Sequence, residues 1–254
     1  MSLHARLRPL ALAAFASLAG LLSPTLPAVA AAHWEYTGQK GSAHWGDLDP
    51  SFAECASGHQ QSPINIVATE RSALPALNFR YGSAAPTIWN NGHTVQVNLP
   101  AGNTLEVGDQ RYELLQFHFH TPSEEHIHGK ASPMVAHFVH RNAAGELGVV
   151  AVLIRAGRPN AALEPLFRHL PRAGERITVD DLSLDLAGVL PSSLGYFDFA
   201  GSLTTPPCSE GVHWMVLKSP ITLSAAQIEA FRKLVGANAR PVQPLNARVI
   251  RESE

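Results

Sequence analysis

The sequence predicts a mainly β fold of the α+β roll type, in which a large, mostly antiparallel, twisted central sheet carries a few short peripheral helices. Two observations lead to this prediction. Runs rich in β-branched and aromatic residues, separated by short polar turns, recur between residues 77 and 217. Convincing helical patterns cover only 160–169 and 224–234, and Ser224 stands at the N-cap position of the second. Short turns between successive strands favour antiparallel pairing.

The expected strands follow one another with little chain between them. They cover 77–81, 87–89, 94–99, 104–107, 111–120, 134–140, 147–155, 195–201 and 213–217. Turns are expected at 90–92 and 100–103, where Asn, Gly and Pro gather. The aromatic segment 33–50 has neither helical nor strand periodicity, and we expect its tryptophans to pack against the main body.

The chain is long enough for one large globular domain, which we place at 33–254. Of its 254 residues 45% are hydrophobic and 16% charged, and no linker-like or low-complexity stretch divides them. Without residues 1–32, Lys and Arg fall from 19 to 17 against 21 Asp and Glu, which gives a net charge of −4. This balance argues against a nucleic-acid partner or an anionic membrane surface.

Residues 1–32 are typical of a secretory signal peptide. Arg6 and Arg8 precede an apolar run at 10–22. Ala-Val-Ala at 28–30 is a small-x-small cleavage site, and Ala-Ala-Ala at 30–32 is the alternative. The apolar run is short for a membrane span. We therefore expect a mature protein that is periplasmic or secreted and has no membrane anchor.

The chain has two cysteines, Cys55 and Cys208. In an exported protein they most simply form one disulfide, and two buried free thiols are the alternative.

A run of alternating aromatic and polar residues, Gln-Phe-His-Phe-His, stands at 116–120. Residues two apart in a strand point to the same face, which places His118 and His120 together. If this strand pairs with the one at 134–140, His137 can approach both. Three neutral imidazoles held on rigid strands, with one coordination position open, are the layout of a catalytic zinc site. Half-buried histidines on a sheet are the alternative interpretation.

Four further stretches favour the zinc interpretation. They are Thr-Pro-Ser-Glu at 121–124, Asn-Asn-Gly-His at 90–93, Gly-Ser-Leu-Thr-Thr-Pro-Pro-Cys at 201–208 and Pro-Val-Gln-Pro-Leu-Asn at 241–246. With these motifs the sequence resembles an α-class carbonic anhydrase of the bacterial, exported kind, over almost all of the mature chain. The resemblance implies a Zn2+ enzyme that reversibly hydrates CO2 to bicarbonate and a proton. Many bacterial members resemble dimers, and a homodimer is expected, although no stretch of the sequence identifies an interface.

The resemblance also implies a role for each residue of the centre. His118, His120 and His137 would bind zinc, which lowers the pKa of a bound water to about 7 and makes hydroxide available at neutral pH. Thr204 would accept a hydrogen bond from that hydroxide and donate its own to Glu124, so that the hydroxide attacks CO2. A Thr204 that faces solvent is the alternative.

Further residues match the substrate pocket and the proton path of the family. The apolar wall beside CO2 corresponds to Val139, Val149, Leu203 and Trp214. His93 matches the proton shuttle, since an imidazole with a pKa near 6.5 suits relay to buffer; without the resemblance it would be interpreted as a turn residue. The waters between the zinc and His93 would be ordered by Tyr36, Asn91 and Gln96. Cys55 and Cys208 match a disulfide of bacterial members that would fix the loop of Thr204.

Metal-binding histidines usually donate their second ring N–H to an acceptor. Gln116 matches the family's acceptor for His118, and a backbone carbonyl near Asn238 matches the acceptor for His120.

The surroundings of His137 depart from the family. The usual glutamate two residues earlier is replaced by Val135, the usual histidine after the Thr204-orienting glutamate by Glu125, and a nearby tyrosine by Phe199. We hypothesise that Glu125 supplies the carboxylate for His137 from the other side. The alternative is that His137 bonds water or nothing.

Two other functions are alternatives to CO2 hydration. A cupin-type metal oxygenase would use Glu124 as a fourth metal ligand, but the expected glycines are absent and nothing in that fold explains 90–93 or 203–207. A non-catalytic, metal-binding relative of the family is the second. His126 and His128 are interpreted as adventitious surface histidines in preference to a second metal site.

Overall fold

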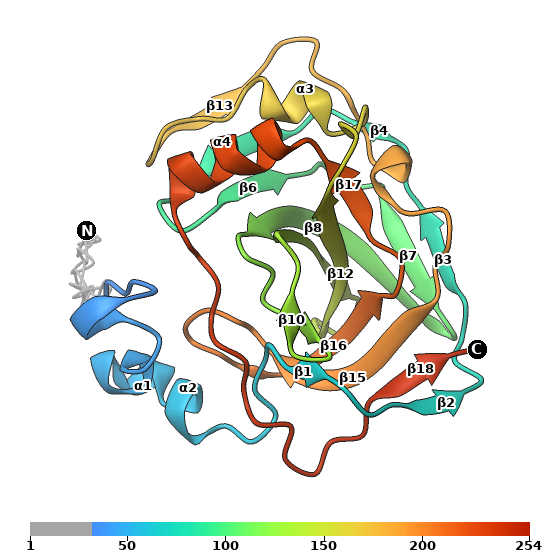
Figure 1. Ribbon diagram of the computed structural model, residues 1–254. Helices are drawn as coiled ribbons and strands as arrows, with labels where there is room; N and C mark the ends of the chain where they lie inside the picture. Colours follow the sequence, from blue (N-terminus) through green and yellow to red (C-terminus); the bar gives the residue numbers. More distant parts are fainter. Residues whose placement is uncertain (1–31) are drawn as a thin grey trace, which may run out of the picture. The chain divides into compact units, whose positions relative to one another are not determined.

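The computed structural model describes residues 32–254 (Figure 1). The expected signal peptide at 1–32 lies outside the described residues, apart from its last position. A 13-stranded sheet dominates the described chain, and sheets of three and two strands accompany it.

The strands of the large sheet are mostly short, and three long ones lie at its middle. The thirteen are β2 (Glu70–Ser72), β3 (Leu77–Arg80), β5 (Thr87–Asn90), β6 (Val95–Asn98), β7 (Thr104–Val107), β8 (Gln110–His120), β11 (Met134–Asn142), β12 (Leu147–Ala156), β13 (Arg176–Thr178), β15 (Tyr196–Ser202), β16 (Glu210–Leu217), β17 (Ile221–Leu223) and β18 (Arg251–Ser253). The small sheets contain β1 (Asn65–Ile66), β9 (His126–Ile127) and β10 (Lys130–Ala131), and β4 (Ser83–Ala84) and β14 (Leu184–Asp185).

The main path of the sheet runs β13-β5-β6-β8-β11-β12-β16-β15-β18-β2. Most neighbours are antiparallel, as predicted, including the β8–β11–β12 centre. Parallel pairs join β12 to β16 and β17, and β18 to β2, so the sheet is mixed. All the expected strands are present, whereas the two- and three-residue strands are too short to leave a periodic pattern in the sequence.

The helices are short and few among the described residues. They are α1 (Trp45–Leu48), α2 (Glu54–Ser57), α3 (Glu164–Phe167) and α4 (Ala225–Val235), with 3-10 turns at Gly38–Lys40, Pro50–Phe52 and Ala187–Val189. No helix in this part of the chain is long and apolar enough to cross a membrane.

Helix α4 lies where the sequence predicts it. Ser224 Oγ accepts from the backbone N–H of Gln227 at 3.1 Å, and the Gln227 side chain accepts from the Ser224 N–H at 2.9 Å. This reciprocal capping box satisfies two N–H groups that the helix leaves unpaired. Gly236, with φ of 81°, follows the last turn.

The prediction of a helix over 160–169 is wrong in its extent. The Asn160 side chain accepts from the N–H groups of Ala162 and Leu163, which holds 161–163 as a turn, and only Glu164–Phe167 is helical. An Asn side chain near a helix start often competes in this way with the helix for the backbone N–H groups. The segment 33–50 is also more helical than expected, because one-turn helices carry no periodic signal.

Two apolar clusters lie on opposite faces of the central strands. Phe117, Phe119 and Phe138 are fully buried in the larger cluster, where each contributes roughly 1.5–3 kcal/mol relative to an exposed side chain. The smaller cluster includes Val135 and Trp214. The histidines alternate with the phenylalanines, so they lie on the face of the smaller cluster.

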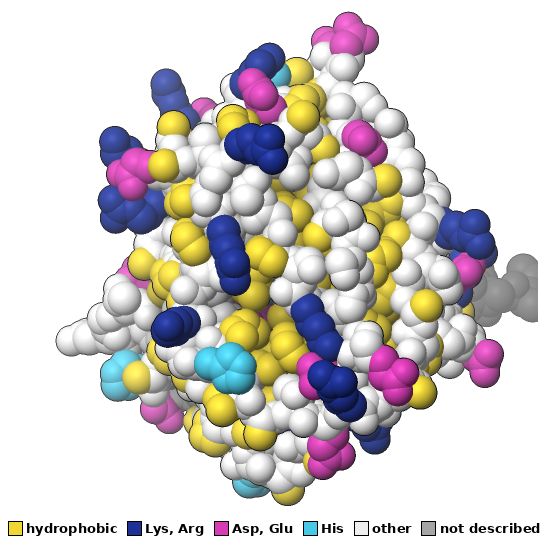
Figure 2. All heavy atoms as spheres, turned by 45° about the vertical axis from the view of Figure 1, so that its right-hand side comes forward, with side chains coloured by type: hydrophobic (Ala, Val, Ile, Leu, Met, Phe, Trp, Pro, Cys, Tyr) yellow, Lys and Arg dark blue, Asp and Glu magenta, His cyan; other side chains and the backbone are white. Residues whose placement is uncertain are grey.

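Charged side chains of both signs are interspersed on the face shown in Figure 2, around a central area of apolar side chains.

Candidate metal centre

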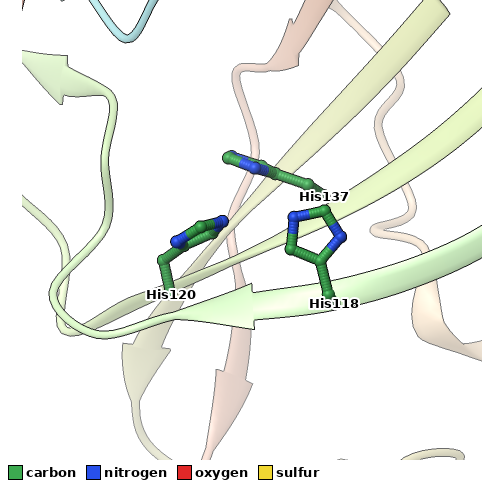
Figure 3. Close-up of side chains that lie close together, drawn as sticks. All are labelled: His118, His120 and His137. Carbon is green, nitrogen blue, oxygen red and sulfur yellow. The ribbon is translucent and has the colours of Figure 1, made fainter. Parts of the chain in front are cut away.

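Two neighbouring strands bring three histidines together. His118 and His120 lie on β8, and His137 on β11 stands directly opposite His118 in the antiparallel register. One ring nitrogen from each residue lies within 4.8 Å of the other two (Figure 3). Strand periodicity and strand pairing together therefore produce the cluster that the sequence predicts.

The other ring nitrogens of the β8 histidines are held by hydrogen bonds. His118 Nδ1 lies 2.9 Å from Gln116 Oε1, and His120 Nδ1 lies 2.7 Å from the Asn238 carbonyl oxygen. Since these oxygens accept, both Nδ1 atoms carry the proton, and both Nε2 atoms keep a free lone pair. His120 Nε2 is buried and has no partner among the described residues. A buried nitrogen of this kind fits a metal ligand.

His137 is held at its Nε2 atom, whereas the β8 histidines are held at Nδ1. Its Nε2 lies 3.1 and 3.2 Å from the two carboxylate oxygens of Glu125, which leaves Nδ1 for the centre. Val135, two residues earlier, is fully buried among apolar side chains.

Burial keeps two of the imidazoles neutral. Removal from water, reinforced by the charge of His137, lowers the pKa of His118 to about 3 and moves that of His120 well below its usual value. Burial also lowers the pKa of His137, but the carboxylates of Glu125 and Glu124 outweigh this effect and raise it. Neutral imidazole is the form that binds a metal.

Glu124 is a buried carboxylate beside the cluster. Its Oε1 accepts from the backbone N–H of Arg240 at 2.8 Å, and its Oε2 has no hydrogen-bond partner within the described chain. Burial raises the pKa of Glu124 to about 8, with Glu125 adding to the rise, while His137, the Arg240 N–H and the Thr204 side chain lower it. The metal-ligating cluster comprises the three histidines and does not include Glu124.

The histidines open into a cavity of about 170 Å³. Its apolar wall contains the four predicted substrate-pocket residues, Val139, Val149, Leu203 and Trp214. Its polar side contains the predicted Tyr36, Asn91, His93, Gln96 and Thr204, together with Trp34, Thr94 and Thr205, which the sequence did not suggest as site residues.

A larger hollow of about 730 Å³ lies over β15 and β16 and is lined by none of the three histidines. Three of its charged groups already have partners: His213 bonds to Asp198, and Arg248 donates to several backbone carbonyls. The smaller cavity, where three histidines bring one ring nitrogen each together, is therefore the candidate site.

Comparison with known proteins agrees with this geometry. Residues 40–254 match the family model for eukaryotic-type carbonic anhydrase. A carbonic anhydrase from Neisseria gonorrhoeae is 46% identical, covering 87% of this chain and 88% of its own, and one from Pectobacterium atrosepticum is 44% identical, covering 92% and 97%. The solved structure of the Photobacterium profundum α-carbonic anhydrase is 48% identical with a TM-score of 0.83, covering 87% of this chain and all of that one.

The chain belongs to the α-carbonic anhydrase family. This family consists of zinc enzymes, and the donor set of three imidazoles, two binding through Nε2 and one through Nδ1, fits that ion. The cupin alternative is therefore wrong.

His93, the predicted proton shuttle, is partly buried and lines the cavity. Its ring stacks on Trp34, with centroids 3.7 Å apart and an interplanar angle of 10°. Partial burial and the nearby His33 lower the pKa of His93, against a smaller opposing effect of Glu35. Trp34 is one of the three cavity residues that sequence reasoning missed, and the aromatic composition of segment 33–50 was the only signal for it.

Two of the predicted water-ordering residues have protein partners. Asn91 Oδ1 accepts from the backbone N–H groups of His93 and Thr94, both at 2.9 Å, so this side chain also shapes the turn. Gln96 Nε2 donates to Asn98 Oδ1 at 2.7 Å.

The predicted disulfide is present between Cys55 and Cys208, and no free cysteine occurs in the part of the chain that the structure describes. It joins α2 to the loop between β15 and β16, which contains Thr204. In the same loop the Cys208 N–H donates to the Thr205 carbonyl at 2.8 Å.

Proposed function

We propose that this protein catalyses the reversible hydration of CO2 to bicarbonate and a proton. One observation carries the proposal: three imidazoles, each fixed by a hydrogen bond at one nitrogen, direct the other nitrogen to a common point at the floor of an apolar-walled cavity. Zinc bound there lowers the pKa of a water in its open position to about 7, which supplies hydroxide at neutral pH.

The residues around the triad would orient the reactants. Glu124 Oε2 is buried without a partner, and the Thr204 side chain already lowers the pKa of Glu124. We assign the Thr204 hydroxyl as its donor, which leaves the Thr204 oxygen to accept a hydrogen bond from the attacking hydroxide. Val139, Val149 and Trp214 offer an apolar surface on which CO2 can lie.

His93 would take the product proton to solvent. It lines the same cavity as the triad and is about half-buried, so one side of the imidazole faces the site and the other can reach buffer. Polar groups between the triad and His93 are supplied by Tyr36, Asn91 and Gln96, which line the same cavity. Stacking on Trp34 holds the ring at the rim.

The place of action that we propose is the periplasm or the medium. The disulfide supports it, because such bonds persist in oxidising compartments. The signal peptide on which it also depends remains a prediction, as does the homodimer. N-terminal sequencing of the exported protein tests the first and sedimentation of the mature chain the second.

The direct test is stopped-flow CO2 hydration by the mature protein, with zinc per chain measured on the same sample. We expect fast hydration that scales with zinc content. Full zinc occupancy with negligible hydration would support the non-catalytic relative and overturn the proposal.

A further inference from the structure

Of the two strands that carry the histidines, β8 supplies a hydrogen-bond acceptor for its histidine His118 and β11 supplies none for His137. On β8, Gln116 stands two residues before His118 on the same face and holds its Nδ1 at 2.9 Å. On β11 the corresponding position before His137 is Val135, which has no polar atom and is fully buried in the smaller apolar cluster. Strand β11 therefore offers His137 no acceptor of its own.

Glu125 provides the acceptor from another element. It lies in the loop after β8, fully buried, with its two carboxylate oxygens 3.1 and 3.2 Å from His137 Nε2. Ser123 holds this loop: its hydroxyl donates to the Glu125 carbonyl at 2.8 Å and accepts from the Ser132 N–H at 2.8 Å. No other side chain of the described residues makes a hydrogen bond to the Glu125 carboxylate.

A buried carboxylate with a single partner is costly unless that partner donates a proton to it. His137 Nε2–H meets this need, and a neutral imidazole protonated on Nε2 keeps its lone pair on Nδ1. That lone pair faces the centre, where it joins the Nε2 atoms of His118 and His120. Hydrogen bonding of a ligand imidazole to a carboxylate also increases its basicity toward a metal.

We propose that Glu125 is the positioning residue of the zinc site, replacing from the loop the acceptor that β11 lacks at Val135, and that these two positions form one coupled unit. The inference rests on the proposed zinc-dependent function. The coupling follows from charge. A carboxylate at 135 would be the third around the His137 ring, after those of Glu124 and Glu125, and like charges in a buried site oppose one another.

The test is the zinc dissociation constant, measured by competition with a chelator. Glu125→Leu, which removes both acceptor oxygens, should weaken zinc binding by about 10- to 100-fold, the usual effect of losing such a partner. Adding Val135→Glu to that variant should recover most of the affinity, whereas Val135→Glu alone should not improve it. Glu146→Leu is the matched control, since Glu146 also accepts a hydrogen bond, from Asn142 Nδ2 at 2.6 Å, but stands at the β11–β12 turn. Wild-type affinity in the Glu125→Leu variant overturns the proposal.

A measurement on the wild-type protein covers the case in which the variant does not fold. In 15N-histidine NMR spectra of the zinc-loaded protein, His137 should carry its proton on Nε2, whereas His118 and His120 should carry theirs on Nδ1. A proton on His137 Nδ1 refutes the proposal. Neither readout needs catalysis, so wild-type protein that binds zinc but fails to hydrate CO2 would overturn the proposed function alone.

Discussion

Removing the disulfide should destabilise the whole domain, and the structure gives the size of the effect. Cys55 and Cys208 are separated by 153 positions, so the bond closes most of the described chain into a loop. In the chain-entropy model a closed loop of this length restricts the unfolded state by about 5 kcal/mol. For a domain of this size each kcal/mol corresponds to roughly 2–4 °C, and the Cys55→Ala, Cys208→Ala variant should therefore melt roughly 10–20 °C lower.

Guanidinium unfolding followed by tryptophan fluorescence checks this value, with zinc held at one saturating concentration because metal binding also stabilises the folded state. The wild type treated with a phosphine reductant should unfold like the variant, and the reductant should leave the variant unchanged. Equal unfolding free energies for the oxidised wild type and the variant would refute the reasoning. A difference that the reductant does not reproduce would assign the effect to the buried Cys208 site itself.

Three further outcomes are expected. Replacing His93 by Ala should slow CO2 hydration in weak buffer without changing zinc content, and imidazole added to the solution should restore the rate; a rate that imidazole cannot restore counts against the shuttle role. Burial holds the pKa of His140 at about 4 against 6.5 in the unfolded chain, so acidification from pH 6.5 toward 4 protonates the unfolded state first and should cost about 3 kcal/mol of stability. A His140→Gln variant should show a flatter pH profile in urea unfolding. Ser224→Ala should lower the free energy of unfolding by about 1 kcal/mol, since it removes the N-cap of α4; an unchanged urea midpoint contradicts this.

The strands and the metal cluster could be predicted because both depend on short-range patterns. Period-2 alternation in β8 and β11 fixes which residues share a face, and adjacent strands then bring the histidines together. Interactions between distant segments leave no such pattern. The sequence gives no sign that Trp34 stacks on His93 or that Arg240 bonds to Glu124 through its backbone. At Asn160 the sequence instead predicts structure that is absent. Residues 160–169 have a helical pattern, but hydrogen bonds to the Asn160 side chain hold the first part of the segment as a turn.

One feature of β8 was visible in the sequence and was missed. Tyr112 and Leu114 face the larger apolar cluster, and so do Phe117 and Phe119. Strict alternation cannot put even-numbered and odd-numbered residues on one face, so β8 must contain an extra residue between the two pairs. The register shows it: Val139 pairs with Gln116 and His140 with Leu114, which leaves Leu115 without a partner on β11. The Leu114-Leu115 doublet is the sequence signal of this β-bulge.

The bulge decides which face the metal ligands occupy. Without Leu115, either Tyr112 and Leu114 leave the core or His118 and His120 turn into it, because a shift of one residue moves every side chain to the other face. Deleting Leu115 should therefore abolish zinc binding or unfold the domain. Leu115→Ala, which keeps the residue count and removes only the side chain, should still bind one zinc per chain. Metal analysis together with circular dichroism distinguishes the two variants. A deletion variant that stays folded with a full complement of zinc would show that the face of the histidines is set by something other than this extra residue.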